Sequence, residues 1–205
     1  MLRLESDFTD YYDGCFSNNA SSVYKRLQHN RKTRADQLNY LKSIGIKTVD
    51  FGPYSKMCSK RDSKFVVYTD PYLHEFAGKH IYSEGEVKNF YKNYLLAEFL
   101  SSSNGYTVKY LQIGERRFRM WMYNPDFMST LVEGTCVAME ELPRQYNYLI
   151  GLPIFSIDYV SNGIEMVAID FNEVQNLQKL GIHTFMSPEE VVREVENALI
   201  TYNKL

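Results

Sequence analysis

The sequence predicts an α+β fold in which an antiparallel β-sheet is flanked by helices and a small α/β element lies at the N-terminus. Short hydrophobic runs separated by turn residues follow one another through residues 94–171, which is typical of antiparallel sheets. A helical pattern leads directly into a strand-like run within residues 33–51. A well-capped helical pattern occupies residues 187–202, so we expect a helix on one face of the sheet.

Composition limits the class of protein. The 205 residues carry a net charge of -2 and are 44% hydrophobic and 15% aromatic, which suits one sizeable domain or two packed lobes. The near-neutral charge gives no general reason to bind nucleic acid or an anionic membrane. Cys15, Cys58 and Cys136 are widely spaced, which indicates reduced thiols. With no long apolar run, we expect a soluble, cytoplasmic protein with no membrane partner.

Residues 1–93 show the pattern of a mixed α/β region. Apolar residues at three-residue spacing end at Gly45, which favours a helix with a glycine stop. The patterns predict helices over Val23–Gln28, Thr33–Ser43 and Glu84–Asn93, strands over Ile46–Phe51 and Lys64–Tyr68, and a loop from Asp70 to Lys79.

Residues 94–205 favour a sheet followed by a helix. Six strands are predicted, over Tyr94–Leu100, Tyr106–Ile113, Arg117–Tyr123, Thr135–Met139, Ile154–Val160 and Glu165–Phe171. Ser187, Pro188 and Glu190 form the N-cap, first position and capping box of the last helix. We therefore expect two intimately packed regions, 1–93 and 94–205, which could form one domain.

Two acids interrupt otherwise apolar strands. Asp158 and Asp170 lie on strands joined by a turn at Ser161–Gly163. Burying a lone carboxylate costs roughly several kcal/mol unless it is paired or bound to a metal. Alternation puts Asp170 and Asn172 on one strand face, and a hairpin would bring Asp158 alongside. The resulting cluster of oxygen atoms is typical of a site for a hard divalent cation.

Four segments in the second half of the chain resemble one family when they are taken in order. They are YLLAEFLS (94–101), TVKYLQIGERRFRMWM (107–122), PDFMSTLVEGTC (125–136) and FSIDYVSNGIEMVAIDFNEVQNL (155–177). In this order they resemble the ATP-grasp superfamily, which includes D-alanine:D-alanine ligases and ribosomal-protein glutamate ligases. The resemblance covers residues 94–180. It implies that residues 94–205 form an ATP-grasp-like core and that residues 1–93 contain a reduced lid.

The resemblance also implies a nucleotide site. Asp158, Asp170 and Asn172 would hold Mg²⁺ against the phosphates of ATP. An acid at Glu98 and a base at Lys109 match the positions of the family's nucleotide contacts. Lys64 and Lys79 are the best substitutes for its two nucleotide lysines, although an exposed surface lysine is the alternative for each.

Some positions depart from the family pattern. Asp170 stands where the family usually has Glu, Met128 stands where it has Arg, and residues 64–93 have only Gly78 and Gly85 in place of a glycine-rich loop. Arg117 and Arg119 share one strand face by alternation, and we expect them to contact phosphate or substrate as catalytic residues. A solvated basic edge is the alternative for Arg119.

The function predicted from the sequence is an ATP-grasp-type ligase that uses Mg-ATP to join a carboxylate to an amine through an acylphosphate. Its partners would be a nucleotide, a carboxylate substrate of unknown identity and a protein partner or second copy. The first alternative is a catalytically inactive ATP-grasp-like binding or inhibitory module. The second is nucleic-acid binding through the basic run Lys25–Arg34, although charge at helical spacing is more often a solvated face.

Overall fold

The structure is a computed structural model. It describes residues 16–30, 32–57, 64–70, 79–90, 94–100, 105–124, 135–143, 150–161, 164–173, 182 and 185–204. Several sequence features fall partly or wholly outside these residues, among them Cys15, Cys58, Gly78, Met128 and positions 162–163 of the turn predicted between the two acidic strands.

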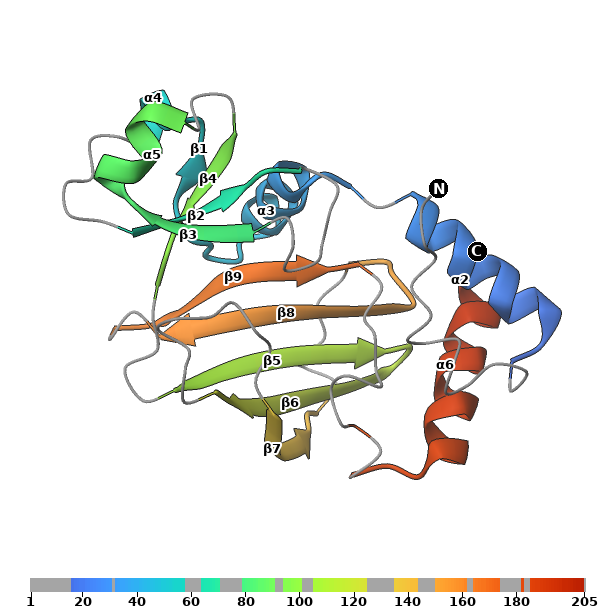
Figure 1. The fold of residues 1–205 in the computed structure, drawn as a ribbon. Helices are drawn as coiled ribbons and strands as arrows, with labels where there is room; N and C mark the ends of the chain where they lie inside the picture. Colours follow the sequence, from blue (N-terminus) through green and yellow to red (C-terminus); the bar gives the residue numbers. More distant parts are fainter. Residues whose placement is uncertain are drawn as a thin grey trace.

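Two antiparallel sheets and their flanking helices form the fold (Figure 1), which confirms the predicted α+β class. The small sheet has the order β1-β4-β2-β3 and the large sheet the order β7-β6-β5-β8-β9. The helices are α2 (Asn18–His29), α3 (Arg34–Ser43), α4 (Tyr54–Met57), α5 (Glu84–Phe90) and α6 (Pro188–Tyr202). The strands are β1 (Phe51–Gly52), β2 (Lys64–Tyr68), β3 (Lys79–Ser83), β4 (Leu95–Glu98), β5 (Tyr106–Ile113), β6 (Arg116–Tyr123), β7 (Thr135–Glu141), β8 (Ile154–Ser161) and β9 (Met166–Asn172).

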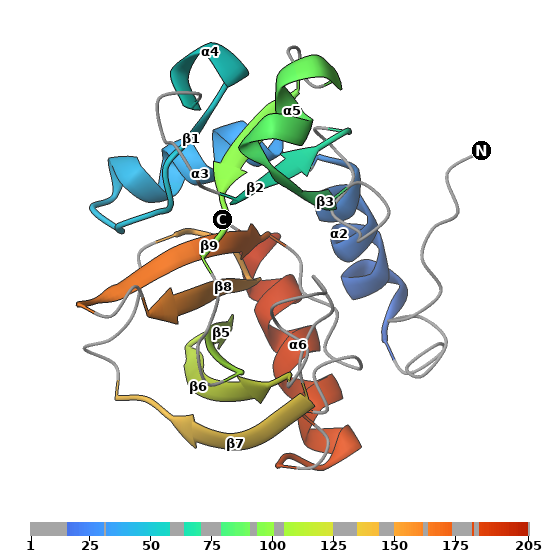
Figure 2. The same cartoon turned by 60° about the vertical axis from the view of Figure 1, so that its left-hand side comes forward.

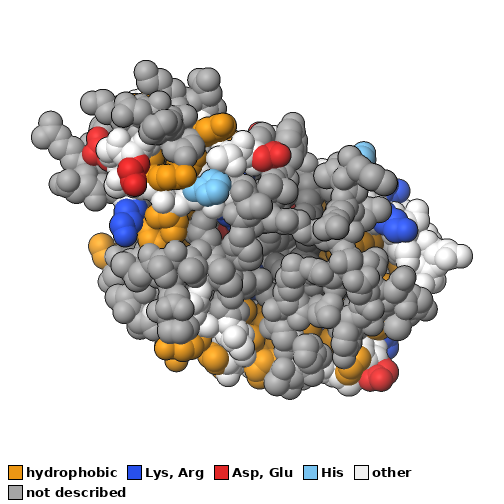
Figure 3. Space-filling view, in the orientation of Figure 1, with side chains coloured by type: hydrophobic (Ala, Val, Ile, Leu, Met, Phe, Trp, Pro, Cys, Tyr) orange, Lys and Arg blue, Asp and Glu red, His pale blue; other side chains and the backbone are white. Residues whose placement is uncertain are grey.

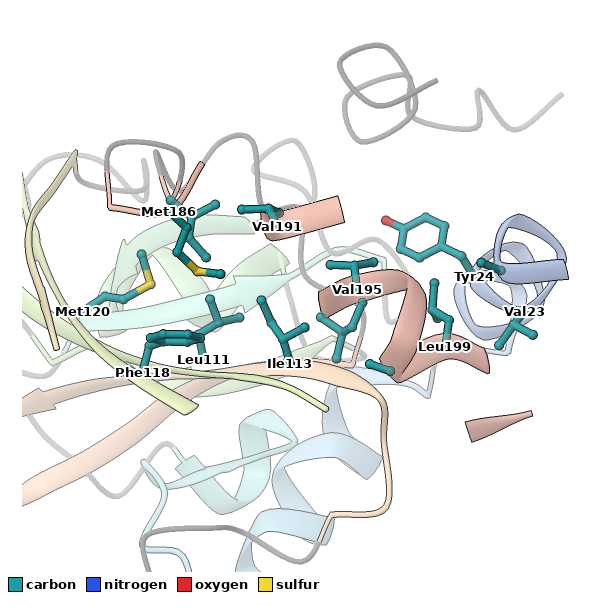
Figure 4. Close-up of a cluster of buried hydrophobic side chains, with 14 of the residues drawn as sticks. Val23, Tyr24, Leu111, Ile113, Phe118, Met120, Met186, Val191, Val195 and Leu199 are labelled. Carbon is teal, nitrogen blue, oxygen red and sulfur yellow. The ribbon is translucent and has the colours of Figure 1, made fainter. Parts of the chain in front are cut away.

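One face of the large sheet packs against α6 and α2. Leu111 and Ile113 of β5 meet Phe118 and Met120 of β6 in a buried cluster with the apolar side of α6 (Figure 4). Each such side chain stabilises the fold by about 1.5–3 kcal/mol relative to its exposed state. The N-cap predicted at Ser187 is confirmed, since its side chain accepts a hydrogen bond from the Glu190 amide. The predicted placement of this helix on a sheet face is therefore confirmed.

The opposite face of the large sheet packs against α3. Tyr110, Phe155, Ile157 and Phe171 form a buried cluster there with Leu41 of α3. Alternation along β5 and β8 separates these residues from the α6 cluster. The large sheet is thus buried on two faces, and its β9 edge lies next to the small sheet in both views (Figures 1 and 2).

The segment from Lys47 to Gly52 joins the two sheets. A strand was predicted over Ile46–Phe51, but the structure divides this segment. Thr48 forms a parallel bridge with Ala168 of the large sheet, whereas Phe51 pairs with Ala97 of the small sheet. The division arises because each half finds its hydrogen-bond partners in a different sheet.

The positions of other elements agree with the predicted ones to differing degrees. β2 and β5 have the predicted bounds, whereas the structure places Lys79 in β3 rather than at the end of the predicted loop. The boundary between residues 93 and 94 stays a prediction, and β4 belongs to the small sheet. Among the described helices, none is long and apolar enough to cross a membrane.

Candidate functional site

The site is built on the hairpin of β8 and β9. Asp158 and Asp170 are direct register partners, and Asn172 stands opposite Ser156. Directly opposed residues have Cβ atoms about 4.5–5.5 Å apart, so the two carboxylates share one location. A bulge follows at Asp158/Tyr159, and bulges often re-aim side chains next to functional sites. The predicted pairing of the two acids is therefore present in the fold.

Lys109 neutralises Asp158 from the neighbouring strand. It is the register partner of Asp158 on β5, and its Nζ lies 2.5 Å from Asp158 Oδ1. The Lys109 side chain is 2% exposed and that of Asp158 is 22% exposed. A cation with so little exposure requires a nearby anion, which explains why a lysine can stand within a buried sheet.

Asp170 is bound by cations from two other parts of the chain. Lys79 at the start of β3 places its Nζ 2.8 Å from Asp170 Oδ2. Arg34 at the start of α3 forms an ion pair with Asp170 Oδ1 and donates from Nη1 to the Phe171 carbonyl at 2.9 Å. The Phe171 amide also donates to Asp170 Oδ1 at 2.9 Å. Both oxygens of Asp170 are therefore engaged.

Tyr68 lies beside the two cations of Asp170. The Arg34 guanidinium carbon is 5.8 Å and the Lys79 Nζ is 5.9 Å from the centre of the Tyr68 ring, within the range of cation–π attraction. Burial raises the pKa of Tyr68, and the positive charge of Arg34 opposes this shift. The phenol is therefore neutral at physiological pH and contributes its ring rather than a charge.

We call Arg34, Lys79, Lys109, Asp158 and Asp170 the charged cluster. Three cations face two carboxylates, so the cluster carries an excess of one positive charge. Elsewhere, the described side chains on the face in Figure 3 show charges scattered rather than gathered in one patch. The cluster thus places positive charge at a partly buried position to which both sheets contribute, where it attracts an anion more strongly than the same charge in bulk water would.

The residues present fit a magnesium–polyphosphate group in their chemistry. Among the described residues, no three His, Cys, Asp or Glu side chains are grouped to hold a metal alone. Mg²⁺, however, is usually held by one or two carboxylates together with substrate phosphates. Asp158, Asp170 and Asn172 offer such oxygen atoms on neighbouring positions of one hairpin.

The structure does not bring Arg117 and Arg119 to the charged cluster. Phe118 and Met120 point into the α6 cluster, so alternation places the two arginines on the opposite face from Lys109. Arg119 forms a half-exposed ion pair with Glu140 at 3.0 Å. Arg117 is buried, and its register partner on β5 is Gln112. Their predicted catalytic role stays a prediction, and the solvated basic edge describes Arg119 better.

Glu98 and Lys64 also lie away from the charged cluster. Glu98 is opposite Phe65 in the register, on the sheet face that carries Phe65 and Leu96, whereas Lys79 shares the other face with Tyr68. Lys64 is exposed at the far end of β2, about 13 Å from Tyr68 at the usual rise per residue. Nucleotide contacts by these two residues stay predictions.

Arg34 is the site residue that sequence reasoning missed. It belongs to the run Lys25–Arg34, which was interpreted as a solvated face or a nucleic-acid contact. The structure instead buries Arg34 to 1% side-chain exposure. One signal was available, since the helix was predicted to begin at Thr33; in the structure Thr33 is the N-cap and Arg34 takes the first helical position. The segment 125–134 of the third resembling motif lies outside the described residues.

Comparisons with solved structures identify the same fold in several ligases at low sequence identity. D-alanine-D-alanine ligase from Coxiella burnetii is 13% identical with a TM-score of 0.55, over 91% of this chain and 60% of that one. A RiPP-associated ATP-grasp ligase from Chryseobacterium gregarium, in complex with ADP and a leader and core peptide, is 12% identical with a TM-score of 0.55, over 88% and 61%. D-alanine–D-alanine ligase from Bacillus anthracis complexed with ATP is 11% identical with a TM-score of 0.54, over 96% and 75%.

These comparisons establish the fold and show how much of each ligase this chain covers. The chain spans about three fifths of the length of the first two ligases. Searches against protein-family models and curated protein sequences give no match.

Proposed function

We propose, from the ATP-grasp fold that this chain shares with known ligases, that the charged cluster binds the polyphosphate of ATP and that the protein uses it to activate a carboxylate. One observation carries the proposal. Lys79 from the small sheet and Lys109 from the large sheet converge on the register-paired acids Asp158 and Asp170. A nucleotide bound there would contact both sheets, as expected for a ligand held between two lobes.

The lysines would exchange partners when the nucleotide binds. Lysine is a point charge on a flexible stem, and Lys79 and Lys109 are each paired with one carboxylate. Phosphate oxygens offer these lysines a stronger concentration of negative charge than a single carboxylate does. Their transfer to the phosphates would make carboxylate oxygens available for a metal.

Magnesium is part of the proposal because the oxygen donors suit it. Asp158, Asp170 and Asn172 would hold the ion, which supplies charge neutralisation at the β- and γ-phosphate oxygens. The chain's own cations would stabilise the same charge during transfer. Contacts from Glu98 and Lys64 to the rest of the nucleotide belong to the proposal too, although neither residue lies in the charged cluster.

The proposed reaction has two steps. A substrate carboxylate oxygen attacks the γ-phosphorus, the bond to the β–γ bridging oxygen breaks, and ADP leaves with an acylphosphate formed. An amine then attacks the acyl carbon, the acyl–oxygen bond breaks, and phosphate and an amide result while the amine loses a proton. The carboxylate and amine remain unspecified in this proposal.

A second candidate is a nucleotide-binding module without ligase activity. It is favoured by the positions of Arg117 and Arg119, which lie on the face opposite the charged cluster. The cations of the charged cluster are each paired with Asp158 or Asp170, and the two arginines predicted to contact a substrate are not among them.

The test is nucleotide binding followed by turnover. Titration calorimetry with ADP and magnesium should give binding to the wild-type protein, and Lys79→Met should weaken it by about tenfold or more. Lys47→Met is the matched control, because Lys47 forms an exposed ion pair with Glu165 outside the charged cluster. Absence of ADP and ATP binding to the folded wild type would refute both candidates. Binding without ADP formation from ATP in the presence of a panel of carboxylates and amines would favour the module.

A further inference from the structure

We infer that Arg34 is a resident cation of the charged cluster and competes with a divalent metal for Asp170, so that this residue sets how strongly nucleotide binding depends on metal. The inference rests on the proposed function, because it concerns the cation requirement of the same nucleotide site. It assigns a role to a residue that comes from outside the β8–β9 hairpin and the strands next to it.

Arg34 is held at Asp170 by several neighbouring groups. Its guanidinium pairs with Asp170 and donates to the Phe171 carbonyl, and its carbon lies near the Tyr68 ring. The start of its helix is itself anchored just after the end of β9, since Glu173 accepts hydrogen bonds from the Lys32 amide at 2.8 Å and from Gln37 Nε2 at 3.0 Å. Arg34 therefore cannot leave Asp170 without disturbing packing around it.

Lys79 differs from Arg34 in this respect. Its Nζ lies 2.8 Å from Asp170 Oδ2, and its flexible stem, unlike the planar guanidinium of Arg34, allows the ammonium to follow a phosphate. Transfer of Lys79 to a phosphate would expose Oδ2, whereas Oδ1 would keep both Arg34 and the Phe171 amide. Only half of the Asp170 carboxylate would then be available.

A metal at Asp170 would stand close to the guanidinium. Like charges repel strongly in a poorly solvated site, and the negative charge of Asp170 is already balanced by Arg34. Asp158 is paired with Lys109 instead, so Asp158 and Asn172 would provide the better oxygen ligands. The expected consequence is that Asp170 is the weakest of the three proposed ligands, that the metal is held mainly by Asp158, and that the phosphates of the nucleotide are partly neutralised by protein cations.

The first experiment measures ADP affinity by titration calorimetry with magnesium and with EDTA. Wild type should lose less than about tenfold in affinity without metal, and Arg34→Met should lose about a hundredfold, with magnesium restoring most of it. Arg193→Met, which removes an exposed arginine paired with Glu194, should behave as wild type. Equal metal dependence in wild type and Arg34→Met would overturn the inference. Failure of wild type to bind ADP in either buffer would instead refute the proposed function.

A second experiment leaves Arg34 in place, in case its replacement prevents folding. Mn²⁺ binding is followed by electron paramagnetic resonance in the presence of ADP, for wild type, Asp158→Asn and Asp170→Asn, after each is shown to unfold cooperatively. Asp158→Asn should weaken Mn²⁺ binding by more than about tenfold, and Asp170→Asn should change it by less than about threefold. A larger loss in Asp170→Asn than in Asp158→Asn would show that the metal binds Asp170, and the inference would be wrong.

Discussion

Asp158 and Asp170 stand opposite each other on β8 and β9, yet their charges are balanced by residues from different parts of the fold. Asp158 is paired with Lys109 from the same sheet, whereas Asp170 is paired with Arg34 from α3 and Lys79 from the small sheet. The second acid therefore ties a helix and a separate sheet to the hairpin. The charged cluster contributes to stability as well as to the proposed binding, and these contributions can be measured separately.

Replacement of Lys109 should destabilise the protein strongly. Lys109→Met leaves Asp158 in the sheet without its nearest cation, and removing one partner of a buried pair costs about 3–5 kcal/mol. We expect about 3 kcal/mol, near the lower end, because Asp158 keeps 22% of its side chain exposed. Urea denaturation measures the change in unfolding free energy. Lys47→Met, in an exposed pair, should cost less than about 1 kcal/mol. If Lys109→Met and Lys47→Met lower the unfolding free energy equally, Lys109 does not stabilise the fold as a buried partner of Asp158.

Tyr68 should make stability fall at alkaline pH. Burial raises its pKa above the ordinary value of 10.0, so above that pH the unfolded chain loses the proton before the folded chain does. The folded state then binds more protons, and stability decreases as pH rises. Between about pH 9 and pH 11, the unfolding free energy of wild type should decrease by more than that of Tyr68→Phe. Urea denaturation at several pH values in this range measures both decreases. Parallel pH profiles would argue against a buried phenol.

Glu141 should have the opposite pH dependence. Its hydrogen bonds to Arg116 hold the pKa of Glu141 below the ordinary value of 4.5, so the pair stabilises the fold above that pH and the contribution is lost as pH falls through the lowered pKa. The side chain is 48% exposed, so the effect should stay below about 1 kcal/mol. Glu141→Gln should be less stable than wild type at pH 7, and the difference should shrink toward pH 3. A difference that persists at acidic pH would mean that packing, rather than charge, causes it.

The N-cap of α6 should be worth about 1 kcal/mol. Ser187→Ala removes the acceptor for the Glu190 amide without changing the apolar side of the helix, and the thermal midpoint should fall by a few degrees. Ser22→Ala, at an exposed position inside α2, should be neutral or slightly stabilising because alanine favours helix. If both variants lose the same stability, the capping role of Ser187 would be contradicted.

The hairpin and its two acids could be predicted because the relevant signals are local. Apolar runs with period-two alternation define β8 and β9, and an acid within such a run calls for a partner. The same holds for α6, whose Ser187 and Pro188 mark its start. In each case neighbouring residues contain the information.

Arg34 and Lys79 could not be placed in this way. Arg34 is buried because β9 lies against the start of α3, and Asp170 is more than a hundred residues away in the sequence. Lys79 begins a strand of mixed polarity whose pairing with Tyr68 in β2 supplies its structure, and strand formation depends strongly on such neighbours. The orientation of Arg117 and Arg119 also needed the register, since alternation alone gives two faces but does not say which one carries the acids.

The segment Lys47–Gly52 has a consequence for how the two sheets can move. The Val49 amide bonds to Ala168 in the large sheet at 3.0 Å, and the adjacent Asp50 carbonyl accepts from the Glu98 amide of the small sheet at 2.8 Å. Two consecutive residues are thus held by different sheets. The separation between the two points of attachment is therefore about one peptide unit, so a relative displacement of the sheets at this point would strain the Val49–Asp50 backbone or break one of these two hydrogen bonds.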